Sequence, residues 1–141
     1  MKISIGADHR GFKLKQHIIK IITSIDWLDV GTNSDERTDY PVFAKKVVKT
    51  IQEKTAQQGV LLCHTGIGMS IAANRFKGIY AALCWSTTIA IKAKEDDNAN
   101  IIVIPAGFVD FENVEEILLS WMNATFKEGK YQERLKLTDA M

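Results

Sequence analysis

Residues 59–74, GVLLCHTGIGMSIAAN, decide the fold class. The run Gly59–Cys63 is apolar without interruption, which is typical of a strand buried on both faces of a parallel sheet. A turn with two glycines follows, and a helix is expected from about Gly68 to Arg75. A buried strand, a tight turn and a helix in this order form the repeating unit of α/β proteins.

The same alternation continues outward from this segment in both directions. Further strands and helices are predicted from apolar runs and from apolar residues at helical spacing. The strands are Lys2–Ala7, Trp27–Val30, Ile79–Cys84 and Ile101–Ile104; the helices are Gly11–Ile22, a segment from Pro41 through Ile51, a segment that Ser86 or Thr87 could cap, Asp110–Phe126 and Tyr131–Leu137. The chain therefore predicts one α/β domain, residues 1–141, with a five-stranded parallel sheet and helices on both faces.

Composition excludes several classes of protein. The chain has 18 basic and 17 acidic residues and no basic run, so nucleic acid is not an expected partner. No apolar run approaches the roughly 20 residues of a membrane helix, and the N-terminus reads as a strand rather than a signal peptide. Cys63 and Cys84 form no disulfide framework. These features predict a cytoplasmic protein that has no membrane partner.

Polar and reactive side chains collect at the ends of the predicted strands. In parallel α/β sheets, ligands bind at the carboxyl ends of the strands. The opposite turns carry only residues that are usual in solvated loops. One rim, the candidate site, is expected to hold residues 8–11, 32–41, 63–70, 84–86 and 95–100.

The turn after Cys63 predicts an anion site. Gly66 and Gly68 let the backbone turn sharply, so that several N–H groups point at one spot beside a helix N-terminus. Phosphate, carboxylate or an enediolate would suit this site; a tight turn without a ligand is the alternative. Ile71 stands where a dinucleotide fingerprint needs its third glycine. Neither a nicotinamide nor another cofactor is expected.

Cys63 stands at the mouth of this predicted anion site. Positive potential there is expected to lower its pKa, and a thiolate can act as a base or a nucleophile. A buried apolar cysteine is the alternative interpretation. Asp8 either caps the first helix or takes part in the chemistry, and His9 is a candidate contact for phosphate or hydroxyl. No metal is expected, because Cys63 and His64 point in opposite directions on a strand and no other Cys or His shows ligand spacing.

Five motifs together resemble a known family. They are GADHRGFKLK (6–15), DVGT (29–32), RTDYP (37–41), CHTGIGMSIAAN (63–74) and NAN (98–100). In this order, and over almost the whole chain, they are similar to ribose-5-phosphate isomerase B, whose wider family includes the galactose-6-phosphate isomerase subunits. The resemblance implies a Rossmann-like domain and a homodimer, or a tetramer, with active sites built from both subunits. It also implies metal-free isomerisation of a sugar phosphate through an enediolate.

The resemblance implies catalytic roles for the residues around the third-strand loop. Cys63 would be the base that moves a proton between two carbons of the sugar. Asp8 would orient a sugar hydroxyl. The enediolate would be stabilised by backbone amides of Gly66, Ile67, Gly68 and Ser70, with help from Thr65.

It also implies binding roles for residues elsewhere in the chain. His9 would contact sugar or phosphate, and Tyr40 would reach across the dimer. Lys130 and Arg134 match two arginines of the family that grip phosphate. Because lysine lacks the bidentate fork of arginine, weaker phosphate affinity than in a standard member is expected.

Three departures from the family pattern bear on activity. Asp96 stands where the family commonly has a histidine that opens the sugar ring, and it is kept as a catalytic candidate, with Asp97 as a substrate contact. His64 replaces the glycine after the cysteine, where it either narrows the pocket or replaces the missing imidazole. Phe108 replaces a basic residue after the fifth strand.

Three functions are compatible with these residues. The first is isomerisation of ribose 5-phosphate, the second is isomerisation of a six-carbon sugar phosphate, and the third is a catalytically silent protein that binds sugar phosphate. The substitutions at positions 96, 108 and 130 motivate the second and third. The intact set of Cys63, Asp8, Thr65, Gly66 and Gly68 argues against loss of chemistry.

Overall fold

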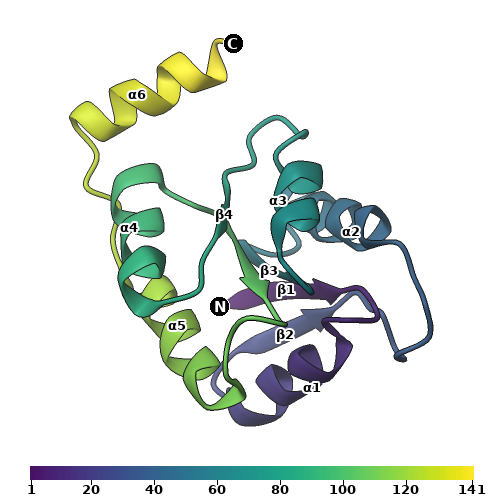
Figure 1. Ribbon diagram of the computed structural model, residues 1–141. Helices are drawn as coiled ribbons and strands as arrows, with labels where there is room; N and C mark the ends of the chain where they lie inside the picture. Colours follow the sequence, from purple (N-terminus) through teal and green to yellow (C-terminus); the bar gives the residue numbers. More distant parts are fainter.

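Five parallel strands run through the centre of the molecule in the order β2-β1-β3-β5-β4 (Figure 1). In the computed structural model, which describes residues 1–141, every neighbouring pair of strands is parallel. The predicted five-stranded parallel sheet is therefore confirmed. The strands are β1 (Lys2–Ala7), β2 (Asp26–Asp29), β3 (Gln58–Cys63), β4 (Ala81–Leu83) and β5 (Ile101–Pro105).

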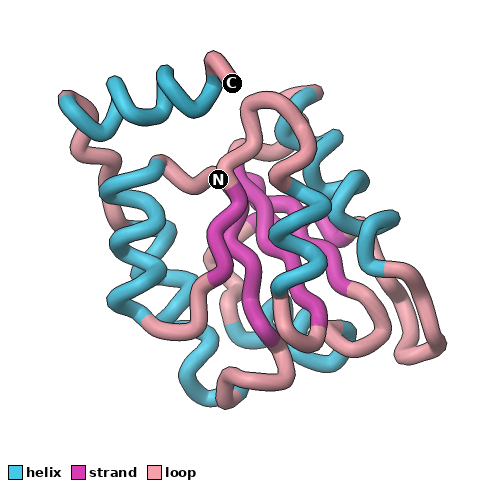
Figure 2. Tube along the Cα trace, turned by 45° about the horizontal axis from the view of Figure 1, so that its top comes forward, coloured by secondary structure: helices cyan, strands magenta, loops and turns pink.

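Helices cover both faces of the sheet (Figure 2). On one face lie α1 (Phe12–Ile21), α4 (Thr87–Asp97) and α5 (Phe111–Asn123); on the other lie α2 (Tyr40–Gln52) and α3 (Ile67–Ala73). The strands are apolar throughout because alternate side chains enter two separate cores. Val60 and Leu62 of β3 face α1 and α5, whereas Leu61 and Cys63 face α2 and α3.

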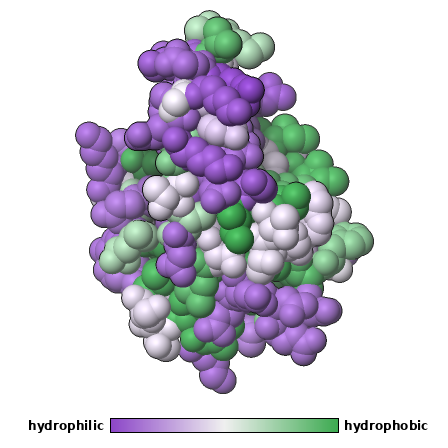
Figure 3. All heavy atoms as spheres, turned by 90° about the vertical axis from the view of Figure 1, so that its left-hand side faces the viewer, coloured by the Kyte–Doolittle hydropathy of each residue, from purple (hydrophilic) through white to green (hydrophobic).

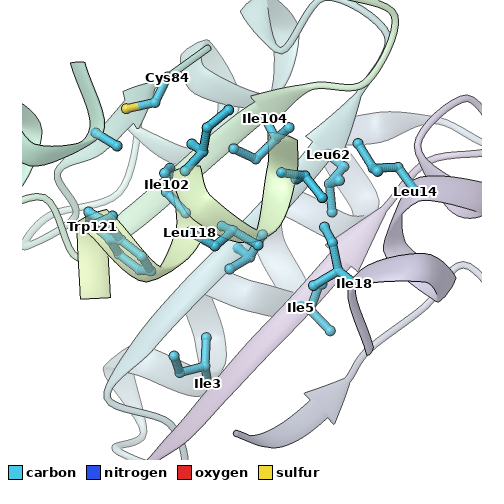
Figure 4. Close-up of a cluster of buried hydrophobic side chains, with 14 of the residues drawn as sticks. Ile3, Ile5, Leu14, Ile18, Leu62, Cys84, Ile102, Ile104, Leu118 and Trp121 are labelled. Atoms are coloured by element: carbon cyan, nitrogen blue, oxygen red, sulfur yellow. The ribbon is translucent and has the colours of Figure 1, made fainter. Parts of the chain in front are cut away.

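The larger core lies between the sheet and helices α1, α4 and α5 (Figure 4). Ile5, Ile18, Ile104 and Trp121 are fully buried in it. Burying one such side chain contributes about 1.5–3 kcal/mol, so this core holds the three helices against the strands. It also contains Cys84, which Figure 4 shows among the apolar side chains.

The C-terminal helix α6 (Lys130–Asp139) stands apart from the sheet (Figure 1). Leu135 is its only buried residue. In Figure 3 this helix lies at the top and presents mostly hydrophilic residues. The Tyr80 hydroxyl donates to the Asp139 carboxylate at 2.6 Å, and the Lys127 amide donates to the Glu95 carbonyl at 3.0 Å. Polar contacts at its two ends therefore set the position of α6.

The order of the strands creates a crevice beside β1. The connection after β1 leads to β2 on one side, while β3 lies on its other side. Ligands of open α/β sheets bind at such a point, outside the carboxyl ends of the strands. Ala7 pairs with Leu62 in this sheet, so Asp8 and Cys63 leave neighbouring strands side by side. None of the helices has the length and apolar character needed to cross a membrane.

Candidate active site

A pocket of about 200 Å³ opens at the carboxyl ends of β1 and β3. A larger hollow of about 500 Å³ lies between the turn before β4 and the end of α6, and neither cysteine lines it. The smaller pocket is where the titratable side chains of the sequence motifs meet. It is lined by Asp8, Arg10, Tyr40, Cys63, His64, Thr65 and Gly68.

The Cys63 thiol is surrounded by backbone amides. The N–H group of Gly66 donates to Sγ at 3.2 Å, and the amides of Met69 and Thr65 also face it. Gly66 makes this arrangement possible because its φ is +74°, a conformation that L-residues rarely adopt. A Cβ atom there would also come within 2.4 Å of Leu83 Cδ1. The glycine thus aims the amides at the thiol.

Burial raises the pKa of Cys63 above its ordinary value of 9.0. The amides of Met69 and Gly66 oppose this shift, and the negative charge of Asp8 adds to it. The expectation of a lowered pKa was therefore wrong. The thiol is only 5% exposed, and desolvation of its charged form outweighs the hydrogen bonds that stabilise it.

The first turn of α3 has free hydrogen-bond donors. No side chain caps this helix, and the Gly68 N–H has no acceptor within the protein. Thr65 Oγ1 accepts from the Ile67 N–H at 3.2 Å. Ser70 instead donates its hydroxyl to the Gly66 carbonyl at 2.9 Å, so its side chain is engaged within the helix. The turn can therefore receive an oxyanion through its backbone.

Tyr40 lines the Cys63 pocket of its own chain. Its ring lies against the backbone of α3: a Cβ atom on Gly68 would stand 2.6 Å from Tyr40 Cζ. Position 68 must therefore be glycine, because the Tyr40 ring leaves no room for a Cβ atom. Arg10 also lines the pocket, although the sequence patterns did not single it out. Its place directly after Asp8 and His9 is the signal that would have found it.

Asp8 and His9 organise the loops around the pocket. Asp8 is 6% exposed, and its Oδ1 accepts from the N–H groups of Arg10 and Gly11 at 2.9 and 3.1 Å. The Asp8 carboxylate thus anchors the turn into α1 and still faces Cys63. His9 Nδ1 accepts from the Thr38 N–H at 3.2 Å, and Thr38 Oγ1 accepts from the His9 N–H at 3.0 Å. This pairing places the proton of a neutral His9 ring on Nε2 and holds the loop before α2.

The turn after β2 is fixed by an ion pair between a buried lysine and an exposed aspartate. Lys15 is fully buried, and its Nζ lies 2.8 Å from both carboxylate oxygens of Asp29. Asp29 Oδ1 also accepts from the Gly31 N–H at 2.9 Å. Removing Asp29 would leave the Lys15 ammonium without compensation in the interior. The pair therefore sets the path of the loop that leads to Thr38 and Tyr40.

His64 lies at the edge of the pocket, against the loop after β5. Its ring lies over Gly107, where a Cβ atom would come within 2.2 Å of Cε1. The ring of Phe108 is 5.3 Å away, centroid to centroid, at a tilt of 57°. An apolar hollow of about 240 Å³ adjoins this pair. It is lined by Thr65, Ile67, Leu83, Trp85, Pro105 and Phe108.

The remaining candidates lie at the opposite edge of the sheet. Residues 95–100 were expected on the same rim as Cys63, which is wrong, because a segment that precedes a parallel strand lies at its amino end. Pro105, at the carboxyl end of β5, pairs with Cys63, and Asp97 precedes Ile101 at the other end of this strand. The two ends are about 13 Å apart at 3.3 Å per residue. Asp96, Asp97, Lys130 and Arg134 do not line the Cys63 pocket of their own chain.

Asp96 is engaged at this amino edge. Its Oδ1 lies 3.2 Å from Lys127 Nζ, in the segment that leads to α6. Asp97 lines a hollow that it shares with Tyr80 and Leu135. No group of three or more His, Cys, Asp or Glu side chains is arranged to hold a metal ion.

The fold and the pocket together define a class of protein. An uncapped helix start, a thiol among backbone amides and a carboxylate meet at the carboxyl edge of a parallel sheet, which is where α/β proteins bind their ligands. Residues 3–137 match the model of the Ribose/Galactose Isomerase family. The chain belongs to this family and is an aldose–ketose isomerase by class.

Individual relatives agree with this assignment. A putative sugar phosphate isomerase of Rickettsia bellii is 44% identical over 135 residues, which are 94% of each chain. Ribose-5-phosphate isomerase B of Escherichia coli is 34% identical over 142 residues, which are 99% of this chain and 95% of that protein. The crystal structure of a ribose 5-phosphate isomerase from Thermotoga maritima superposes with a TM-score of 0.97 at 41% identity, covering 99% of this chain and 98% of that one.

A further solved relative contains a sugar phosphate. Ribose-5-phosphate isomerase B from Mycoplasma genitalium with bound ribulose 5-phosphate has a TM-score of 0.93 and 33% identity to this chain. The match covers 99% of this chain and 94% of that one. The Rossmann-like fold predicted from the motifs is thereby confirmed.

Proposed function

We propose that this protein interconverts ribose 5-phosphate and ribulose 5-phosphate, with Cys63 as the base. The observation that carries the proposal is the thiol of Cys63, held beside the N–H of Gly66 and the carboxylate of Asp8 in one pocket. A relative that binds ribulose 5-phosphate supports the choice of a five-carbon substrate.

The chemistry moves one proton between neighbouring carbons. The Cys63 thiolate takes the proton from C2 of the open-chain aldose, which forms an enediolate. The same thiol returns the proton to C1, while a proton moves from the C2 oxygen to the C1 oxygen with the help of Thr65 or Asp8. Amides at the start of α3, including the free N–H of Gly68, face the developing oxyanion. Such a donor commonly contributes about 3–4 kcal/mol.

We further propose that the active site is completed by a second copy of the chain. Lys130 and Arg134 lie on α6, whose end borders the turn before β4 at the amino edge of the sheet, whereas Cys63 lies at the carboxyl edge. One chain cannot bring them to a single sugar. The apolar side chains of Trp85 and Phe108, 54% and 69% exposed, line the apolar hollow that shares Thr65 with the Cys63 pocket, and they offer a surface for the second copy to cover.

In this arrangement α6 of one copy reaches the pocket of the other, and Lys130 and Arg134 contact the phosphate. Both positive groups already lie close together, each about 5.5 Å or less from the ring of Tyr131. Arg134→Ala is expected to raise the Michaelis constant for ribose 5-phosphate, because the guanidinium binds phosphate in a bidentate manner. An unchanged Michaelis constant would remove Arg134 from the site.

Mixing Cys63→Ala with Arg134→Ala tests the shared site at a ribose 5-phosphate concentration far below the raised Michaelis constant of Arg134→Ala, where neither variant alone is active. Each proposed site takes Cys63 from one copy and Arg134 from the other. A dimer of one Cys63→Ala copy and one Arg134→Ala copy therefore has one site with both residues intact and one site that lacks both. Random reassociation is expected to restore about one quarter of the wild-type rate in a symmetric dimer. Recovery of no activity, or a monomer at assay concentration, would contradict sharing.

The substrate is tested with the purified protein. Ribose 5-phosphate is expected to be converted to ribulose 5-phosphate at an unchanged rate in the presence of a chelator. Faster turnover of a six-carbon aldose phosphate would replace the proposed substrate with that sugar. Binding of sugar phosphate without any proton exchange would favour the silent binding protein. We place the protein in the cytoplasm, a reducing compartment that suits its two free cysteines.

A further inference from the structure

We infer that His64 is the acid that opens the sugar ring, a role that rests on the proposed isomerisation and that Asp96 does not fill. His64 lies in the pocket of Cys63, and neither of its ring nitrogens has a hydrogen-bond partner within the protein.

Ring opening needs an acid because ribose 5-phosphate closes into a five-membered ring. The bond between C1 and the ring oxygen must break before C2 can lose its proton. The ring oxygen takes up a proton and becomes the C4 hydroxyl, while the C1 hydroxyl releases its proton to water and becomes the aldehyde. Imidazole gives and regains protons near neutral pH, so water restores the proton that His64 donates.

The loop after β5 holds the His64 ring in place. Gly107 leaves room for the imidazole, because any Cβ atom at this position would overlap it. The Gly107 N–H donates to the His64 carbonyl at 2.9 Å, and Phe108 packs against the ring at 5.3 Å. The ring is thus oriented by its surroundings, while its nitrogens stay available to a ligand.

The other candidate acids are engaged elsewhere. Asp96 forms an ion pair with Lys127 at 3.2 Å and does not line the pocket of Cys63 in its own chain. This pair also links α4 to the segment before α6, so Asp96 acts as a tether of the C-terminal helix. His9 accepts a hydrogen bond from Thr38 at Nδ1, which holds its ring at the loop before α2.

The pH dependence of a reaction that uses His64 also reflects the charged and titratable groups around its ring. The ring packs against Gly107 and Phe108 on the side of β5, and neither carries charge. The groups that share its pocket are Asp8, Arg10, Tyr40 and Cys63. A pH profile therefore reports several groups at once, and a comparison of two substrates isolates the ring-opening step more cleanly.

The test compares a substrate that forms a ring with one that does not. Ribulose 5-phosphate stays open, because the oxygen that would close its five-membered ring carries the phosphate. His64→Ala and His64→Gln are expected to slow turnover of ribose 5-phosphate about 100-fold. Both variants should keep deuterium exchange at C1 of ribulose 5-phosphate in D2O within about twofold of the wild-type rate, since this exchange bypasses ring opening.

A matched control is available on α1. His17 packs against Phe111 at 5.0 Å, a similar histidine–phenylalanine pair away from the pocket. His17→Ala is expected to leave both reactions unchanged, whereas Asp96→Asn should lower both by the same factor. Equal losses in the His64 variants, no loss, or a selective loss in Asp96→Asn would overturn the assignment. Absence of C1 exchange in the wild-type protein would instead overturn the isomerase function.

Discussion

The strand-to-helix junctions after β3 and β4 both contain a cysteine, but the surroundings of the two thiols differ. β3 ends at Cys63, and β4 is followed directly by Cys84; in both cases a short turn then leads into a helix. Cys63 accepts a hydrogen bond from the Gly66 amide and opens into a pocket. Cys84 is fully buried in the larger core, and its thiol donates weakly to the Ala82 carbonyl at 3.6 Å.

The difference lies in which groups accept hydrogen bonds from the backbone N–H groups in the first turn of the helix. After β4, the Ser86 hydroxyl accepts from the Ile89 N–H at 3.3 Å, as the sequence predicted for this cap. After β3, no side chain caps α3, and Gly66 turns the amides toward the thiol. The uncapped start of α3 thus leaves backbone donors free beside Cys63, whereas the Ser86 side chain already occupies a donor at the start of α4.

Breaking the turn after β3 should have the largest effect. Gly66→Ala forces φ of +74° on an alanine and places its Cβ 2.4 Å from Leu83 Cδ1, so the amides must move. We expect a loss of about 10²–10³ in kcat, the usual effect of removing an oxyanion donor. Steady-state kinetics with ribose 5-phosphate will measure it.

Gly78→Ala is the matched control for backbone strain. Gly78 has φ of +80°, but a Cβ atom at this position would meet no other atom within 4 Å, and the residue lies in the turn before β4. Its substitution should cost about 1–3 kcal/mol of stability through strain and leave kcat unchanged. Equal kcat losses in the two variants would mean that strain, rather than the position of the amides, explains Gly66→Ala.

The pH dependence of thiol alkylation distinguishes the two cysteines. Because burial raises the pKa of Cys63 above 9.0, the thiol is protonated at pH 7. Its reaction with iodoacetamide should accelerate about tenfold per pH unit between 7 and 9, as the thiolate fraction grows. Burial raises the pKa of Cys84 to about 12, so Cys84 should stay unmodified. A rate at Cys63 that is already constant at pH 7 would contradict the raised pKa.

The smallest effect is expected at the cap after β4. Ser86→Ala removes the side chain that accepts from Ile89 and should cost about 1 kcal/mol of unfolding free energy. Urea denaturation will measure this cost. Isomerase activity should stay at the wild-type level, and a large loss of kcat would show that the junction after β4 also serves the chemistry.

Local sequence patterns were sufficient to predict the architecture. Alternate residues of β3 enter different cores, and this is why Gly59–Cys63 reads as an unbroken apolar run. The same patterns placed Cys63, Thr65 and Asp8 at the carboxyl edge, where the structure has them in one pocket. These predictions succeeded because strand order along the chain and the parallel direction decide which residues meet at an edge.

Features that depend on packing between distant elements were not predictable in this way. The pKa of Cys63 depends on burial by α2 and α3, which no residue near position 63 reports. Tyr40 reaches the pocket of its own chain because Gly68 leaves space for its ring. Asp96 was predicted at the wrong edge, because a residue that precedes β5 lies at the amino end of this strand.

Deuterium exchange at C1 of ribulose 5-phosphate is the most direct test of the central claim, that Cys63 is the base. Wild-type protein and Cys84→Ala should both incorporate solvent deuterium, whereas Cys63→Ala should lose about 10²–10⁴ in rate. Circular dichroism will confirm that both variants are folded. Exchange at the wild-type rate in folded Cys63→Ala would contradict the account and assign the base to another group in the pocket.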